Sequence, residues 1–360
     1  MFVSLPPPPV QNVVRESAQR PGDIVRLAPG KILCAGEPVT PVHLETPFTT
    51  SVLRNREAAT QAAPYALRFA IDADGRAVDI QVDPHPFPGF YIDTDDLAPA
   101  LAASRFAAGM PRQTCSIAYT AEFVPITDAP LALLYETASA PVPGIATREI
   151  YERLNADGDC ARGPGSPRRL NYPNFETIAQ ASGTRSWSFL RFDVDAAGHT
   201  RNVHVVGASG SAALDVASVR ALRGNLYAPG KALHGCTFHF YRLGNQPIAA
   251  PSIPADAPKD SGALPACAID PKTVRPLYTG EAYPRPFAAR RIEGYAIIGF
   301  DTAPWGAVGN VRVLAAEPAA TFGSAASRVI SSGSVAESDV GHRGCVVRVQ
   351  FRLPQATPAE

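Results

Sequence analysis

The six cysteines are the residues of this chain with the clearest chemistry, because they form three evenly spaced pairs. Each pair encloses a segment of nearly the same length: Cys34 and Cys115, Cys160 and Cys236, Cys267 and Cys345. A fixed period indicates one unit used three times, and paired cysteines that cross-link small units are typical of an oxidising compartment. We therefore predict one disulfide within each unit, although spacing alone does not fix the connectivity. Six buried free thiols are the alternative.

The other residue types that perform chemistry form no recognisable set. No C-x-x-C spacing suggests zinc, and no histidine pair has the helical spacing of a zinc protease. The stretch 207–210 differs from a nucleophile elbow, since its second glycine comes one position early. The acidic loops 72–75 and 155–159 lack the bidentate glutamate of a calcium loop, although the second could bind a cation weakly. We therefore expect no enzyme activity, no metal and no cofactor.

Composition narrows the classes of partner. The 33 basic residues balance the 33 acidic ones without a block of like charge, which disfavours nucleic acid and anionic membranes. No apolar stretch is long enough to span a bilayer. The N-terminus lacks the basic and apolar regions of a signal peptide, which alone would indicate a cytosolic protein. Because the cysteines indicate export, we expect an export or anchoring segment upstream of this sequence.

Each unit predicts a strand, a tight turn, a second strand, a helix and a last strand. The first strands are Tyr65–Ile71, Ser188–Val194 and Ala296–Asp301. A glycine that suits a hairpin turn falls six positions after a phenylalanine in every unit: Gly75, Gly198 and Gly306. The return strands place these apolar residues inward: Ile80 and Val82, Val203 and Val205, Val311 and Val313.

Helices and last strands complete the predicted unit. The first helix runs from Asp95 to about Ala107, the second has Ser211 as its N-cap, and the third carries Phe322 on its apolar stripe. The last strands begin at the second cysteine of each pair. These elements predict an α+β fold of three tandem small domains, each an antiparallel sheet packed by one or two helices.

The third unit, with Tyr283-Pro284, the strand that ends at Phe300, Gly306 and Asn310-Val311, resembles the C-terminal domain of the TonB energy transducers. The second unit resembles it as well, and the first does so more weakly, without a Tyr-Pro pair. The family usually carries one such domain behind a membrane anchor and a proline-rich spacer. The three units, the absence of an anchor and the cysteine pairs are departures from that pattern.

The resemblance implies a periplasmic protein-interaction module in which a sheet edge pairs with an extended segment of an outer-membrane receptor. The implied edges are Thr237–Leu243 and Val346–Leu353. The implied partner-binding residues are Tyr172, Pro173, Tyr283, Pro284, Arg348, Gln350 and Arg352. The alternatives are ordinary solvated strand residues for the edges, and structural turns with a packed tyrosine for the Tyr-Pro pairs. No nucleic acid or small-molecule substrate is expected.

Proline-rich stretches set the predicted boundaries. They give a proline-rich N-terminal segment at 1–30, domains at 31–126, 148–243 and 265–354, linkers at 127–147 and 244–264, and a tail at 355–360. The domains either follow one another as beads on a semi-stiff string or pack edge to edge. Two functions are compatible with this organisation. One is receptor binding within energy transduction, which needs an inner-membrane motor and an upstream anchor, and the other is a sensory or scaffolding ectodomain.

Overall fold

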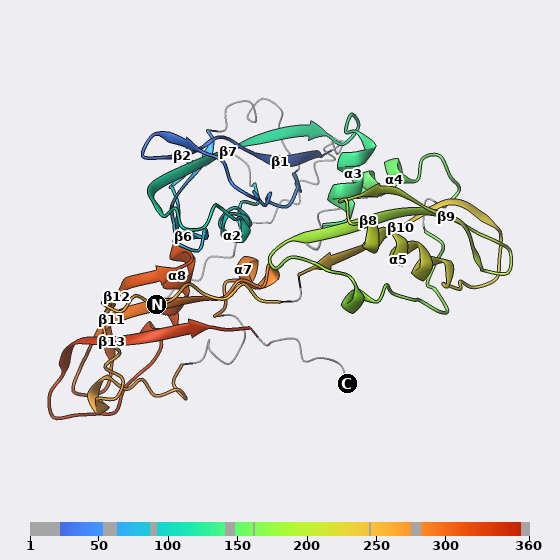
Figure 1. Ribbon diagram of the computed structural model, residues 1–360. Coiled ribbons are helices and arrows are strands. Elements are labelled where there is room, and N and C mark those ends of the chain that lie inside the picture. Colours follow the sequence, from blue (N-terminus) through green and yellow to red (C-terminus); the bar gives the residue numbers. More distant parts are fainter. Residues whose placement is uncertain are drawn as a thin grey trace, which may run out of the picture.

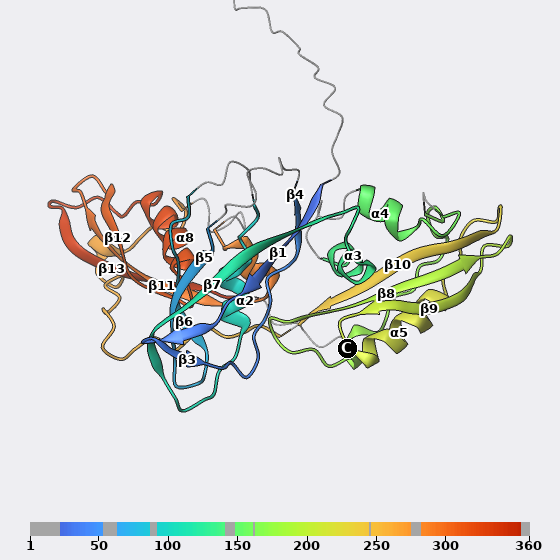
Figure 2. The same cartoon turned by 90° about the horizontal axis from the view of Figure 1, so that it is seen from above.

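Three antiparallel sheets with few helices make up the described part of the chain, which confirms the predicted α+β class. The structure is a computed structural model and describes residues 22–52, 63–86, 92–140, 148–160, 163–244, 246–274 and 282–353. The first sheet lies between the other two (Figures 1 and 2). Residues 1–21 of the predicted proline-rich N-terminal segment and the predicted tail at 355–360 lie outside the described residues.

The second and third sheets have the same plan. The second comprises β8 (Arg185–Val194), β9 (Thr200–Ala208), α5 (Ala212–Arg223) and β10 (Leu233–Leu243). The third comprises β11 (Gly294–Thr302), β12 (Val308–Glu317), α8 (Ala320–Ser331) and β13 (His342–Phe351). In the second sheet β8 lies between β9 and β10, and in the third sheet β11 lies between β12 and β13. The last strand is therefore an edge strand of its sheet.

The three predicted turn glycines have the same conformation. Gly75, Gly198 and Gly306 have φ of +73°, +90° and +83°. An added Cβ would meet a backbone carbonyl oxygen at 2.3, 2.2 and 2.3 Å, that of Phe106, Tyr227 and Val335 respectively. Each glycine carbonyl in turn accepts the N–H of that same residue. The hairpin turn therefore requires glycine both for its positive φ and for the close approach of the chain that follows the helix.

The residue four positions beyond each turn glycine also has a positive φ and marks a β-bulge. In the second sheet this residue is Asn202, whose Nδ2 donates to Asp193 Oδ2 at 2.6 Å. In the third sheet it is Asn310, which donates to Asp301 at 2.8 Å. The first sheet has Asp79 there. An asparagine suits a left-handed bulge position, and the loss of this bond fits the weaker resemblance of the first unit.

The bulges also correct the prediction for two return-strand valines. Val82 and Val313, both expected to face inward, are about half exposed. The register of β6 (Ala77–Val82) and of β12 shifts at irregularities before or beside these residues. A bulge interrupts the two-residue alternation on which the expectation rested.

The first sheet is larger than predicted, with seven strands. Its hairpin β5 (Tyr65–Ile71) and β6 packs with α2 (Leu97–Ala103), which ends earlier than expected. The remaining strands are β1 (Asp23–Pro29), β2 (Ile32–Cys34), β3 (Glu37–Val39), β4 (Thr50–Val52) and β7 (Arg112–Pro125). Assigning all of 1–30 to a proline-rich segment is therefore wrong for β1, because its apolar residues pair with the long strand β7.

The predicted linker 127–147 is also partly folded. It contains α3 (Leu131–Ala138), and α4 (Arg148–Leu154) follows it. Both helices pack against Trp187 and Phe189 on one side of the second sheet, and α5 covers the other side (Figure 1). Pro130, one of the prolines that suggested an extended linker, is the N-cap of α3, where it does not interrupt the helix. The short helices η1 (Phe175–Thr177), η2 (Pro265–Cys267) and α7 (Arg285–Ala289) complete the fold.

The three predicted disulfides are present as Cys34–Cys115, Cys160–Cys236 and Cys267–Cys345. All six cysteines are buried. Within the part of the chain that the structure describes, no helix is long and apolar enough to cross a membrane.

The sheets pack against one another rather than forming separate beads. The first and third share one hydrophobic core, in which α2 and α8 both take part. At their seam the N–H of Ile80 donates to Pro318 O at 2.9 Å, and the N–H of Asp79 donates to Glu317 Oε2 at 2.8 Å. The edge of β6 is thus bonded to the end of β12 and to the residue that follows it.

Arg290 joins all three parts of the molecule at one buried point. Its guanidinium donates to both carboxylate oxygens of Asp96 at 2.6 Å and to Glu45 at 2.9 Å. It also donates to the carbonyl oxygens of Thr46 and of Gly183, which precedes β8. The Arg290 side chain is fully buried. Asp96 and Glu45 hold the pKa of this guanidinium above its ordinary value, although burial alone would lower it. The cluster therefore fixes the orientation of the three sheets.

Glu317 makes the seam between the first and third sheets sensitive to pH. Burial raises the pKa of its carboxyl to about 7. Because the folded protein then holds this proton more tightly than the unfolded chain, the free energy of unfolding falls as pH rises from about 4.5 to about 7. We expect Glu317→Gln to remove that fall and to stabilise the protein at pH 8 by about 2 kcal/mol. Urea unfolding at pH 4.5 and pH 8 measures the difference.

The matched control is Glu337→Gln, which removes an exposed carboxylate from the third sheet's last loop. It should leave the pH dependence as in the parent protein. If Glu317→Gln leaves the slope between pH 4.5 and pH 7 unchanged, the Glu317 carboxyl is not the group that titrates there.

Candidate functional site

The outer edge of the last strand, on which the family resemblance places partner binding, has a different environment in each sheet. In the first sheet it is occupied by the chain itself. Tyr119 of β7 pairs with Tyr65 of β5 on one side and with Pro29 of β1 on the other. The pairing with β1 is antiparallel and runs from Tyr119 to Pro125. In the first sheet, the internal strand β1 is therefore already added to this edge.

In the third sheet, the start of the edge is covered by the segment that joins the second and third sheets. Ser261 exchanges hydrogen bonds with the backbone of Val346, and the N–H of Arg348 donates to Asp260 Oδ2 at 3.2 Å. The Arg348 guanidinium donates to Pro258 O at 3.1 Å. Arg348, predicted to contact a partner, is thus engaged within the chain.

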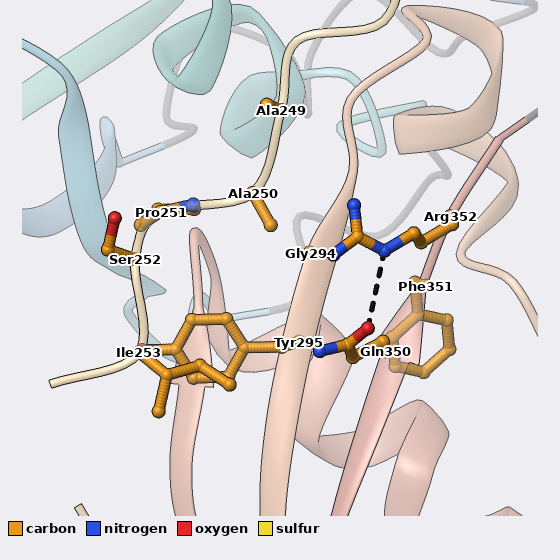
Figure 3. A pocket seen from close by; sticks show the side chains of 10 residues that line it. All are labelled: Ala249, Ala250, Pro251, Ser252, Ile253, Gly294, Tyr295, Gln350, Phe351 and Arg352. Atoms are coloured by element: carbon orange, nitrogen blue, oxygen red, sulfur yellow. Dashed lines mark hydrogen bonds between the residues drawn. The ribbon is translucent and has the colours of Figure 1, made fainter. Parts of the chain in front are cut away.

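Gln350 and Arg352, two further predicted contact residues, line a pocket of about 390 Å³ beside the end of β13 (Figure 3). Arg352 Nε donates to Gln350 Oε1 at 3.2 Å. The stretch 249–253 forms another wall of the pocket, which Tyr295 also lines. These two residues remain accessible, but beside a strand whose first half is covered.

In the second sheet, the edge of β10 is open. Only its start is held, because Asp159 bonds to the backbone of His234 and Asn155 accepts from the Thr237 hydroxyl at 2.9 Å. From Phe238 to Leu243, no hydrogen bond from the described residues reaches the side of β10 that faces away from β8. Unpaired backbone groups along a strand edge are what an added strand binds.

Register identifies which backbone groups point outward. Cys236 pairs with Phe192 in the second sheet, as Cys345 pairs with Phe300 in the third. In the third sheet, Val346 and Arg348 are the residues whose backbone is bonded from outside. The equivalent positions of β10, continued by the two-residue period, are Thr237, His239 and Tyr241. His239 and Tyr241 therefore offer backbone donors and acceptors to an added strand.

Aromatic side chains flank the open edge on both faces. Tyr172 is 64% exposed, and its ring meets the Phe240 ring edge-on at 6.2 Å between centroids. On the opposite face Tyr241 is 41% exposed. Next to it, the His239 ring stacks on Phe189, and burial lowers the pKa of His239. The edge thus combines backbone groups with accessible aromatic surface.

The two predicted Tyr-Pro pairs have different surroundings. Pro173 is buried and fixes the chain beneath the exposed Tyr172. Tyr283 instead packs edge-on against Phe322 and Phe351, and its hydroxyl donates to Ile292 O at 2.7 Å. Burial raises the pKa of the Tyr283 hydroxyl, and the neighbouring Pro284 is buried too. The geometry therefore agrees with the structural alternative for Tyr283 and leaves Tyr172 available for contact.

Two residues near this edge were not predicted as contacts, Tyr241 and Arg242. Tyr241 was missed because its exposed fraction depends on how α3 and α4 cover the neighbouring face. Arg242 follows Cys236, Phe238 and Phe240 at the inward positions of β10, where an arginine is out of pattern. This charged residue in an apolar row was the sequence feature that could have identified Arg242.

A comparison with known families agrees with this location. Residues 169–239 match the family model described as Gram-negative bacterial TonB protein C-terminal. The matched stretch contains Tyr172, Pro173, β8, β9, α5 and the first part of β10. No curated protein matches the chain. The second sheet is therefore a TonB-like region, and it is also the sheet with the open edge.

Metal chemistry has no visible support in the described residues. No group of three or more histidine, cysteine, aspartate or glutamate side chains is placed to hold an ion there. Asp157, in the acidic loop 155–159, faces Arg191 at 3.8 Å instead.

Proposed function

We propose that this protein is a periplasmic interaction module that binds an extended segment of another envelope protein by strand addition to β10. The observation that carries the proposal is the open edge of Phe238–Leu243, at the end of the last strand of the sheet that contains the TonB-like residues 169–239. The partner class implied by the family is an outer-membrane receptor. Three tandem copies of the domain, the first degenerate, are part of the same proposal, supported by the shared turn, bulge and disulfide positions.

The pairing of β1 with β7 supports the binding mode. There, a segment of the chain binds the equivalent edge through an antiparallel ladder of seven residue pairs. Backbone hydrogen bonds supply affinity in this mode, and side-chain contacts at alternate positions supply selectivity. Tyr172 and Tyr241 lie where such side-chain contacts would form, one on each face of the sheet.

Energy transduction is a separate part of the proposal, because it requires an anchor and a motor. The buried Arg290 cluster supports the alternative, a sensory or scaffolding ectodomain of an envelope protein. It holds the three sheets in one arrangement, which suits the presentation of a binding edge at a fixed angle. We propose no enzyme activity, cofactor, nucleic-acid partner or small-molecule substrate for either case.

A photo-crosslinking experiment tests the edge. A benzophenone residue placed at Tyr172 is expected to trap an outer-membrane receptor in envelope vesicles of a cell that makes the protein. Tyr241→Pro should reduce the trapped fraction about tenfold or more, because it removes an outward N–H and places a ring against the incoming strand. Proline is tolerated at such an edge position, so the fold should persist.

Two controls make this result specific. Tyr241→Thr keeps the backbone N–H and should lose much less of the crosslink than the proline variant. A benzophenone at Val216, which is exposed on α5, should trap no receptor. Equal crosslinking from both sites, or recovery of an inner-membrane signalling protein alone, would argue against receptor binding at β10.

A further inference from the structure

Arg242, near the open end of β10, is a buried cation to which the described residues supply no counter-ion. Only 7% of it is exposed, and its Nε and Nη1 atoms are buried without a hydrogen-bond partner. No ion pair from the described residues reaches it, whereas the buried Arg290 has Asp96 and Glu45. Burial lowers the pKa of the Arg242 guanidinium, as expected for a charge that nothing nearby compensates.

An unpaired buried cation destabilises the protein that carries it. Arg242 occupies a position in β10 that continues the inward row of Phe238 and Phe240, where an apolar residue would pack without this penalty. Its guanidinium lies on the same face as Tyr172, which contacts Phe240. The Arg242 charge at this inward position therefore points to a counter-ion that the bound segment supplies.

The first sheet shows which residue of an added strand would face Arg242. Cys115 of β7 pairs with Phe69, as Cys236 of β10 pairs with Phe192. The position of β7 equivalent to Arg242 is therefore Ala121, and Ala121 pairs directly with Leu27 of β1. A strand added to β10 in the same register would place one side chain opposite Arg242, on the same face.

We propose that the segment bound by β10 carries an aspartate or glutamate at the position facing Arg242. This inference rests on the proposed function and adds the chemistry of the partner to it. An Arg–carboxylate pair forms charge-assisted, often bidentate hydrogen bonds. Backbone hydrogen bonds alone do not distinguish one sequence from another. The Arg–carboxylate pair therefore fixes the register of the added strand and selects acidic segments over neutral ones.

Two synthetic peptides test the proposal on the full chain. The first has the sequence of Asp23–Pro29, and the second is the same peptide with Leu27→Asp. Backbone amide shifts of His239, Tyr241 and Leu243 in NMR titrations report binding at β10. The aspartate peptide is expected to bind about tenfold more tightly than the parent peptide.

Arg242→Met keeps the length of the side chain and removes the charge. It should abolish the preference for the aspartate peptide while leaving the parent peptide's affinity unchanged. Because it removes an unpaired buried charge, this variant should fold at least as well as the parent protein. Arg223→Met, which removes an exposed charge from α5, is the matched control and should retain the tenfold preference.

The outcomes separate the two proposals. Equal affinity of the two peptides for the parent protein, with shifts at β10, overturns the role of Arg242 and leaves strand addition intact. The same holds if Arg242→Met retains the preference. Titrations in which neither peptide shifts the amides of residues 238–243 overturn strand addition at β10 as well.

Discussion

Arg290→Met is expected to destabilise the protein by about 3–5 kcal/mol, because it removes the buried cation that Asp96 and Glu45 share. Asp96 would keep the N–H of Phe48, and the carbonyls of Thr46 and Gly183 would lose the Arg290 donor. Since these groups belong to different sheets, the loss should also loosen the packing of the three sheets. Urea unfolding at pH 7 measures the first effect, and small-angle X-ray scattering of the folded variant measures the second.

The triple variant Arg290→Met, Asp96→Asn and Glu45→Gln is the informative control. It removes the stranded charges together, so most of the lost stability should return. The two carboxylate substitutions alone should also be destabilising, since they leave the arginine buried without counter-ions. If Arg290→Met unfolds at the same urea concentration as the parent protein, the cluster does not hold the sheets together.

Removing the second disulfide by Cys160→Ala with Cys236→Ala is expected to cost about 4 kcal/mol. Cross-linking residues this far apart restricts the unfolded chain by about that amount. The effect should reach the binding edge, because the disulfide holds the stretch from Asn155 to Cys160 against the start of β10. Denaturant unfolding gives the stability, and amide exchange at His234, whose N–H donates to Asp159 Oδ1, reports the local opening.

Alanine at both positions avoids leaving a reactive thiol, and the parent protein treated with a reducing agent provides a second route to the same state. Both should unfold at a similar, lower denaturant concentration. A double variant as stable as the parent, with unchanged exchange at His234, would mean that the hydrogen bonds of Asp159 and Asn155 hold this stretch without the disulfide.

The repeated core could be predicted from the sequence, because each feature of it is local. Alternating apolar residues located β5, β8 and β11, and the spacing from phenylalanine to glycine located the hairpin turns at Gly75, Gly198 and Gly306. The disulfide partners followed from the period. Strand alternation and turn chemistry act over a few residues, so one sequence is enough to see them.

Contacts between the sheets could not be predicted in the same way. Arg290 meets Asp96 and Glu45 across 194 and 245 positions, and no periodic pattern connects these residues. The helices α3 and α4 and the strand β1 lie near prolines, so composition suggested linkers where tertiary packing decided the structure. Tyr172 and Tyr283 share the same local motif, and only their surroundings in the fold distinguish a contact residue from a core residue.

The internal strand β1, and the segment around Ser261 that bonds to the start of β13, also bear on how many partner segments one molecule binds. A chain with three vacant edges could bridge several partners, or pair with its own copies, and so form networks or aggregates. Because β1 occupies this edge in the first sheet and the segment around Ser261 covers the start of it in the third, we expect the molecule to bind one partner segment. It should therefore form one-to-one complexes, in which the first and third sheets set the orientation of the single receptive strand.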